Sequence, residues 1–106
     1  MNNQEMKISN MDLEVLKRYL DYFDGKIVLI DVTGVIDTII ECDNFYYSNS
    51  LDGQELALNS SFQDQRLSIK WDKINYISYE SDEPDKEFND IELFLDGLSI
   101  RIWTEE

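Results

Sequence analysis

The sequence lacks histidine altogether, and Cys42 is its only cysteine. Histidine is the side chain that titrates nearest neutral pH, so the commonest general acid–base catalyst is missing. A zinc site would need histidine and cysteine ligands that the chain does not have. A single cysteine also excludes an intrachain disulfide. We therefore expect no enzyme activity, no metal ion and no other cofactor, and a fold that depends on its hydrophobic core.

Basic residues are scarce as well. Nine lysines and arginines face 23 acidic residues, which gives a formal net charge of -14. The acids are spread along the chain, with ten in residues 1–53 and thirteen in residues 54–106. The negative electrostatic field of such a chain repels phosphate groups and anionic lipids. It predicts no direct nucleic-acid binding and no membrane binding, and it favours a basic protein surface as the partner.

Long apolar stretches are missing too. No segment approaches the roughly twenty apolar residues that span a bilayer, and the first residues lack the apolar centre of a signal peptide. A cytoplasmic location is therefore the default expectation. The length of 106 residues and the even composition predict a single domain over residues 1–106. With 42% hydrophobic residues, the chain is expected to fold rather than remain disordered.

Residues 10–24 have the one clear helical pattern. Apolar residues recur there at spacings of three and four: Leu13, Leu16, Leu20 and Phe23. Ser9 or Asn10 can cap the first turn, and Gly25 follows as a C-terminal cap. These signals agree and predict an amphipathic helix that must pack on another element.

The chain after Gly25 has the pattern of strands and turns. Segments rich in β-branched or alternating apolar residues are 26–32, 35–42, 45–48, 55–59, 66–71 and 74–79, followed by a final hairpin that ends near residue 103. The first two segments are nearly continuous apolar runs, so we expect them to be buried strands. One N-terminal helix and about seven strands predict an α+β fold. The expected architecture is a strongly bent antiparallel sheet or a small β-barrel, with a broad sheet as the alternative.

The final hairpin has the strongest local signal. Asp96-Gly97 is a dipeptide typical of a two-residue turn in which both residues have positive φ. This turn predicts the cross-strand pairs Leu95–Leu98, Leu93–Ile100 and Ile91–Ile102 on one face, and Phe94–Ser99 and Glu92–Arg101 on the other. We expect Glu92 and Arg101 to form a complementary charge pair.

Residues 81–89 are predicted to form an acidic, solvated loop before that hairpin. Carboxylates in and next to it come from Asp82, Glu83, Asp85, Glu87 and Asp90. Their spacing differs from that of a calcium loop, because Pro84 and Lys86 occupy the alternate positions after Asp82. The loop can instead present a line of negative charge to a basic site on another protein.

Three aromatic residues complete the candidate partner-binding set. Phe88 lies among the acids, where an apolar anchor would suit an interface. Tyr46 and Tyr47 are adjacent in a predicted strand, so they face opposite sides, and at least one is expected to reach the surface. The partner-binding candidates are therefore Asp82, Glu83, Asp85, Glu87, Phe88, Asp90, Tyr46 and Tyr47.

These features favour a small acidic inhibitor or neutralising partner that docks on a basic protein surface, as toxin-immunity proteins and phage-encoded inhibitors of nucleases do. Charge would steer association, and a few aromatic anchors would hold the complex. The alternative is a self-associating structural or regulatory small-barrel module that pairs through an exposed strand edge. The sequence leaves the identity of the partner and the oligomeric state open.

Overall fold

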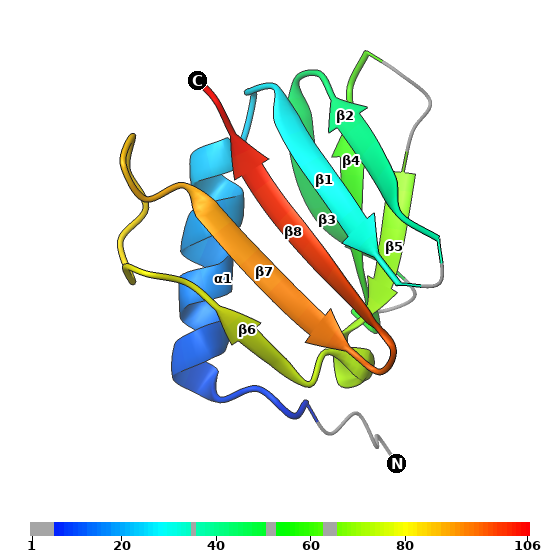
Figure 1. Cartoon of the computed structure of the whole chain (residues 1–106). Helices are drawn as coiled ribbons and strands as arrows, with labels where there is room; N and C mark the ends of the chain where they lie inside the picture. Colours follow the sequence, from blue (N-terminus) through cyan, green and yellow to red (C-terminus); the bar gives the residue numbers. More distant parts are fainter. Residues whose placement is uncertain (1–5, 35, 51–52, 63–65) are drawn as a thin grey trace.

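The computed structural model describes residues 6–34, 36–50, 53–62 and 66–106. Within these residues the chain forms an N-terminal α-helix, eight strands and a short 3-10 helix, so the fold is α+β (Figure 1). The elements are α1 (Asn10–Phe23), β1 (Val28–Thr33), β2 (Thr38–Cys42), β3 (Phe45–Ser50), β4 (Glu55–Ser60), β5 (Arg66–Lys70), η1 (Trp71–Lys73), β6 (Tyr76–Ser78), β7 (Asp90–Leu95) and β8 (Leu98–Thr104).

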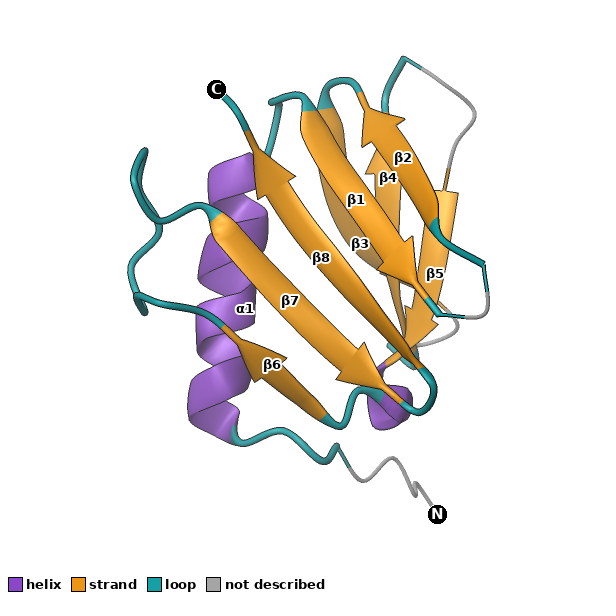
Figure 2. Ribbon diagram, in the orientation of Figure 1, coloured by secondary structure: helices purple, strands orange, loops and turns teal. Residues whose placement is uncertain are grey.

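The strands form two antiparallel sheets. The larger has the order β2-β1-β8-β7-β6, and the smaller has the order β3-β4-β5. Figure 2 shows the five-stranded sheet in front, with α1 and the three-stranded sheet behind it. The molecule therefore has two layers, and α1 and the small sheet share the second layer.

Helix α1 forms where its capping and charge pattern predict it. The Ser9 hydroxyl accepts a hydrogen bond from the Asp12 amide at 3.1 Å, which satisfies one of the free N–H groups of the first turn. Glu14 and Arg18 approach to 3.7 Å across one turn. The helix ends at Phe23, and Gly25 follows with a φ of +79°, a conformation that glycine adopts without strain.

One hydrophobic core lies between the layers. The buried face of α1 packs on residues from the facing sides of both sheets: Val28, Ile30, Phe45, Leu56, Leu58, Ile91, Leu93, Ile100 and Ile102. The ring of Phe23 meets that of Phe45 edge-on at 6.2 Å and that of Tyr19 at 6.3 Å. The Phe23–Phe45 contact attaches the helix to β3, at the junction between the two sheets.

The described residues do not form the small barrel that was one of the expected architectures, and they contain eight strands where about seven were expected. The described strands do not close a barrel, because β2 and β3 belong to different sheets. Asn44, in the turn between them, has a φ of +52°. The amide of Phe45 then donates to the carbonyl of Lys26, and the amide of Gly25 donates to the carbonyl of Phe45. These bonds start β3 beside the segment before β1, so the chain moves into the second layer.

The expectation that the first two strands are buried is also wrong in part. In β1, Val28 and Ile30 are buried, but Leu29 and Asp31 are half-buried because they point to the other side of the sheet. In β2, Ile39 is 65% exposed because this strand lies at the edge. The strand begins at Thr38, and Val35, which was expected to begin it, lies outside the described residues.

The register of the final hairpin is confirmed for every predicted pair. The turn differs from the prediction, because Gly97 has a φ of +77° whereas Asp96 does not have a positive φ. Only glycine avoids the Cβ penalty of the left-handed region, and the turn uses that region at a single position. No helix among the described residues is long and apolar enough to cross a bilayer.

Candidate functional site

One face of the five-stranded sheet is not covered by any helix or strand that the structure describes. The opposite face carries the core residues of β1, β7 and β8 against α1 and the small sheet. Because side chains alternate along a strand, the residues between these core positions point away from both covering elements. They define a surface that we call the open face.

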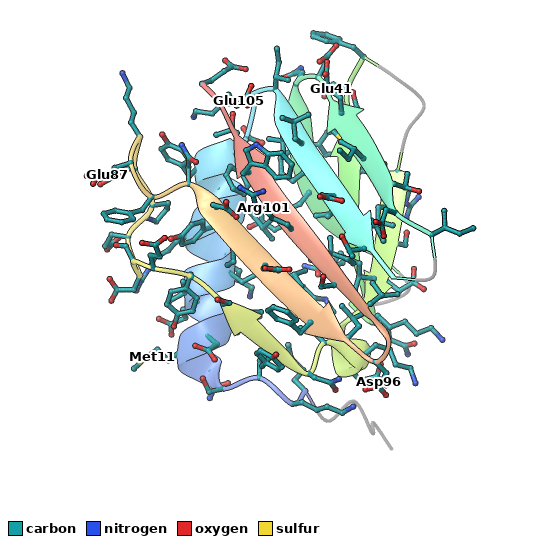
Figure 3. The ribbon with its side chains drawn as sticks, viewed as in Figure 1. Met11, Glu41, Glu87, Asp96, Arg101 and Glu105 are labelled. Carbon is teal, nitrogen blue, oxygen red and sulfur yellow. The ribbon has the colours of Figure 1, made fainter. Side chains whose placement is uncertain are left out.

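Three rows of side chains cross the open face, because the register places their members opposite one another. The Trp103 row contains Glu41, Leu29, Trp103 and Asp90. The Arg101 row contains Ile39, Asp31, Arg101, Glu92 and Ser78. The Phe94 row contains Thr33, Ser99, Phe94 and Tyr76. Figure 3 shows Arg101 on the side of the sheet that faces the viewer.

Arg101 organises the middle of this face. Its Nε donates to the Asp90 carboxylate at 2.8 Å, and a second guanidinium nitrogen contacts the same oxygen. The guanidinium also lies 4.3 Å from the centre of the Trp103 ring, in a cation–π contact. The hydrogen bond that Arg101 donates to Asp90 raises the pKa of Arg101, although burial opposes this shift.

Glu92 lies opposite Arg101 as expected, and its charge also favours the charged guanidinium, but the direct ion pair of Arg101 is with Asp90. Trp103 lies two residues along β8 from Arg101 and directly opposite Asp90. Because the Arg101 guanidinium lies over the Trp103 ring, it is closer to Asp90, which is opposite Trp103, than to Glu92.

Aromatic and aliphatic side chains occupy the rest of the open face. The rings of Tyr76 and Phe94 stack at 4.5 Å with an interplanar angle of 11°. Tyr76 is 56% exposed, and Trp103 and Phe94 are half-buried. Neighbouring rows are about 6.7 Å apart along the strands, so the Trp103 row and the Phe94 row are about 13 Å apart in that direction.

The open face is negatively charged on balance. The three rows contain one cation, Arg101, and four carboxylates: Asp31, Glu41, Asp90 and Glu92. A shallow recess of about 180 Å³ lies at one end, lined by Ser78, Tyr79, Glu80, Asp90, Glu92 and Arg101. The open face therefore carries both aromatic side chains and the carboxylates that border them.

The acidic loop, residues 81–89, adjoins the open face through Asp90. The Asp85 carboxylate accepts hydrogen bonds from the amides of Glu87 and Phe88, at 2.8 and 2.9 Å. Two helix residues hold its other end: Tyr19 donates to the carbonyl of Ser81 at 2.6 Å, and Arg18 donates to a second loop carbonyl. The loop is therefore fixed by its own bonds and by α1.

These bonds divide the candidate residues of the loop into two groups. The exposed side chains of Asp82, Glu83 and Glu87 point their charge to solvent. Asp85 uses one carboxylate oxygen to hold the loop, and Phe88 is half-buried. Asp90 belongs to β7 and to the open face.

The two tyrosine candidates lie on the other sheet. Tyr46 is 42% exposed on β3, opposite Asn59. Tyr47 points to the helix, where its hydroxyl donates to Asp21 at 2.9 Å. Burial, and then the bond to Asp21, raise the pKa of Tyr47 to about 12. The structure therefore brings Asp82–Asp90 together at one side and places Tyr46 and Tyr47 elsewhere.

Sequence reasoning missed most residues of the open face. Ile39 and Trp103 were not among the candidates, although the register of the last hairpin already put Phe94 and Arg101 on a common side. Extending that alternation to Trp103 would have found the aromatic anchor next to Arg101.

No group of three cysteine, aspartate or glutamate side chains among the described residues is arranged to hold a metal ion. Cys42 is buried at the end of β2, and this burial raises the pKa of its thiol. No protein-family model matches the sequence, and comparisons with curated proteins and with solved structures gave no match.

Proposed function

We propose that this protein is an acidic inhibitor or neutralising partner that docks on a basic surface of another protein through its open face. The observation that carries this proposal is the combination of aromatic anchors and carboxylates on one uncovered sheet surface. Toxin-immunity proteins and phage-encoded inhibitors are the functional types that this chemistry fits.

The anchors supply affinity. Trp103 and the Tyr76–Phe94 stack are large, amphipathic and held in place by neighbours, so they lose little conformational freedom on binding. Interfaces concentrate their binding energy in a few such side chains, surrounded by polar contacts that exclude water. The separation of about 13 Å between their rows along the strands lets both anchors lie within one interface of standard size.

The carboxylates make the open face selective for a cationic partner. The open face holds four acids against Arg101, and the whole chain has a formal charge of -14. A cationic partner surface is attracted at long range, and an anionic one is rejected. Arg101 already shields Asp90, so Asp31, Glu41 and Glu92 are the acids of this face that a basic partner would neutralise.

The acidic loop contributes steering rather than anchoring. It is fixed by Asp85 and by α1, and it places Asp82, Glu83 and Glu87 beside the open face. Charges at the rim of an interface mainly change the association rate. We therefore assign the loop an effect on how fast the partner arrives.

A second candidate function, a self-associating structural or regulatory module, is favoured by the free edge of β2 at the side of the same sheet. That edge is a different surface from the open face.

The proposal is tested by capturing partners from source cells on the immobilised protein and eluting them with increasing salt. Binding kinetics of the captured partner are then measured with Trp103→Ala and Phe94→Ala. Removing a central aromatic anchor costs about 2 kcal/mol or more, so each variant should dissociate about 30-fold faster. Tyr46→Ala is the control, because Tyr46 is an exposed aromatic residue that lies on the other sheet.

A second set of variants separates steering from anchoring. Changing Asp82 to Asn and Glu83 and Glu87 to Gln should slow association and leave dissociation nearly unchanged. Asp85 is kept, because its carboxylate holds the loop. Loss of binding in Tyr46→Ala but not in Trp103→Ala would place the interface on the three-stranded sheet and refute the proposal. An association rate constant that does not change with salt concentration would refute charge steering.

A further inference from the structure

Strand β2 is a free and poorly protected edge of the five-stranded sheet. It pairs with β1 and with no other described strand. Natural proteins protect such edges with lysine, proline, a bulge or a very short strand. The five residues Thr38–Cys42 include neither lysine nor proline, and their register with β1 is uninterrupted. Ile39 and the preceding Ile36 are 65% and 76% exposed.

The hydrogen-bond pattern of the final hairpin indicates which residues of β2 direct their N–H and C=O groups toward the free edge. In a two-residue turn, the flanking Leu95 and Leu98 form a hydrogen-bonded pair. Antiparallel bonding alternates from residue to residue, and the register continues without a break through β8 and β1 to β2. The alternation joins Ile40 to β1 and leaves the N–H and C=O groups of Ile39 and Glu41 directed at the free edge.

Strand length and charge together favour one register for a second β2 strand at this edge. Centred on Ile40, an antiparallel pair uses all five residues Thr38–Cys42 of each copy and places each Ile39 opposite Glu41 of the second copy. Asp37 would then lie opposite Asp43, but Asp43 belongs to the turn toward β3, where its Oδ1 is buried. Centred on Glu41, the pair would place two carboxylates directly opposite each other. Centred on Ile39, it would place Glu41 opposite Asp37 of the second copy. Like charges in directly opposite positions are destabilising, so the Ile40-centred register is the favoured one.

We propose that the β2 edge is a self-association site, where two copies of the chain pair antiparallel about Ile40 and form one continuous sheet. Ile39 and Glu41 then form two symmetry-related hydrogen-bonded pairs, in the isologous arrangement typical of dimers. This site rests on the second candidate function and gives it a partner, a second copy, and a register; it is separate from the proposed docking of a basic protein, because it leaves the open face of both copies uncovered.

Net charge controls this association. Two copies of charge -14 repel each other, and the repulsion acts over a Debye length of about 10 Å at 0.1 M salt but only about 3 Å at 1 M. The contact itself consists of main-chain hydrogen bonds and aliphatic side chains, which salt does not weaken in this way. Dimerisation should therefore strengthen as salt rises, in contrast to binding of a basic partner.

Sedimentation velocity of the full chain at 0.1 and 1 M NaCl tests the site. The dimer fraction of the unsubstituted protein should rise with salt. Ile39→Lys places a cation opposite each Glu41, and these two charge pairs should lower the dissociation constant at 0.1 M by about 2- to 30-fold. Ile39→Glu places acids opposite acids and should remove the dimer at both salt concentrations. Combining Ile39→Glu with Glu41→Lys should restore it.

Tyr76 provides matched controls, because it is exposed on the same face but lies on β6, at the opposite edge of the sheet. Tyr76→Lys and Tyr76→Glu change the net charge equally and should leave the dimer close to that of the unsubstituted protein. A chain that stays monomeric at 1 M NaCl overturns the proposal. So does weakening by both Ile39 variants, because that result indicates unspecific apolar contact. Neither result depends on whether the open face binds a basic protein.

Discussion

Substitution of Gly97 should lower the stability of the protein through backbone strain alone, without a steric clash. Gly97 has a φ of +77°, and a Cβ atom built there meets no heavy atom within 4 Å. The cost of Gly97→Ala is therefore the left-handed conformation itself, about 1–2 kcal/mol. Gly97→Val should cost more, because a β-branched side chain is further restricted. Gly97→Asn should cost less than Gly97→Ala, because asparagine adopts this region most readily among the other residues.

Gly34 provides the opposite case. Its φ is not in the left-handed region, but an added Cβ would lie 3.0 Å from the Cβ of Leu98 and 3.2 Å from the carbonyl oxygen of Gly97. The cost at this position is steric, so Gly34→Asn should destabilise the protein more than Gly34→Ala. The order of the alanine and asparagine variants is thus reversed between the two glycines.

Urea unfolding measures all five glycine variants, together with Glu92→Ala as a control in the same hairpin. Glu92→Ala should cost less than about 1 kcal/mol, because cross-strand charge contacts at the surface are weak. If Gly97→Asn is as destabilising as Gly97→Ala, the left-handed turn is not the reason that glycine occurs there. If Gly97→Val and Glu92→Ala lose the same stability, our account of the hairpin is refuted.

Three further predictions concern titration, the loop and metals. Because burial and Asp21 raise the pKa of Tyr47 to about 12, the folded chain holds this proton more tightly than the unfolded chain. Stability should therefore fall as pH rises from about 10 toward 12, and Tyr47→Phe should flatten that fall in urea melts at each pH. Asp85→Ala should speed hydrogen exchange at the two backbone amides that donate hydrogen bonds to the Asp85 carboxylate, whereas Glu83→Ala should not. EDTA should leave Tm unchanged; a rise of several degrees with calcium would contradict this, because a bound metal stabilises the native state by mass action.

Local signals in the sequence were enough to predict the helix and the last hairpin. In α1, the spacing of apolar residues, the Ser9 cap and Gly25 act within a few residues of one another. In the hairpin, a two-residue turn sets the register of both strands, and the core face follows from alternation. The Arg101–Asp90 pair was missed because side-chain stacking on Trp103, rather than register, selects the acid.

The arrangement of the sheets depends on contacts between distant parts of the chain. Strand β1 pairs with β8 across some seventy residues of sequence, and no local pattern specifies that pairing. The same is true of the separation of β2 from β3, which depends on hydrogen bonds between Phe45 and residues 25–26. A continuous apolar run such as 26–32 indicates a strand but does not tell whether one or both of its faces are covered.

The acidity of the chain explains how an uncovered sheet face and an unprotected edge can coexist in one small protein. An exposed surface with Trp103, Phe94 and Tyr76 invites unspecific association, and so does the edge at Ile39. A charge of -14 opposes contact between copies at low salt, where the repulsion has its longest range. The same charge attracts a cationic surface, so it selects the partner that covers the open face. The two surfaces therefore respond to salt with opposite sign: a basic partner binds faster at low salt, whereas pairing at β2 strengthens at high salt.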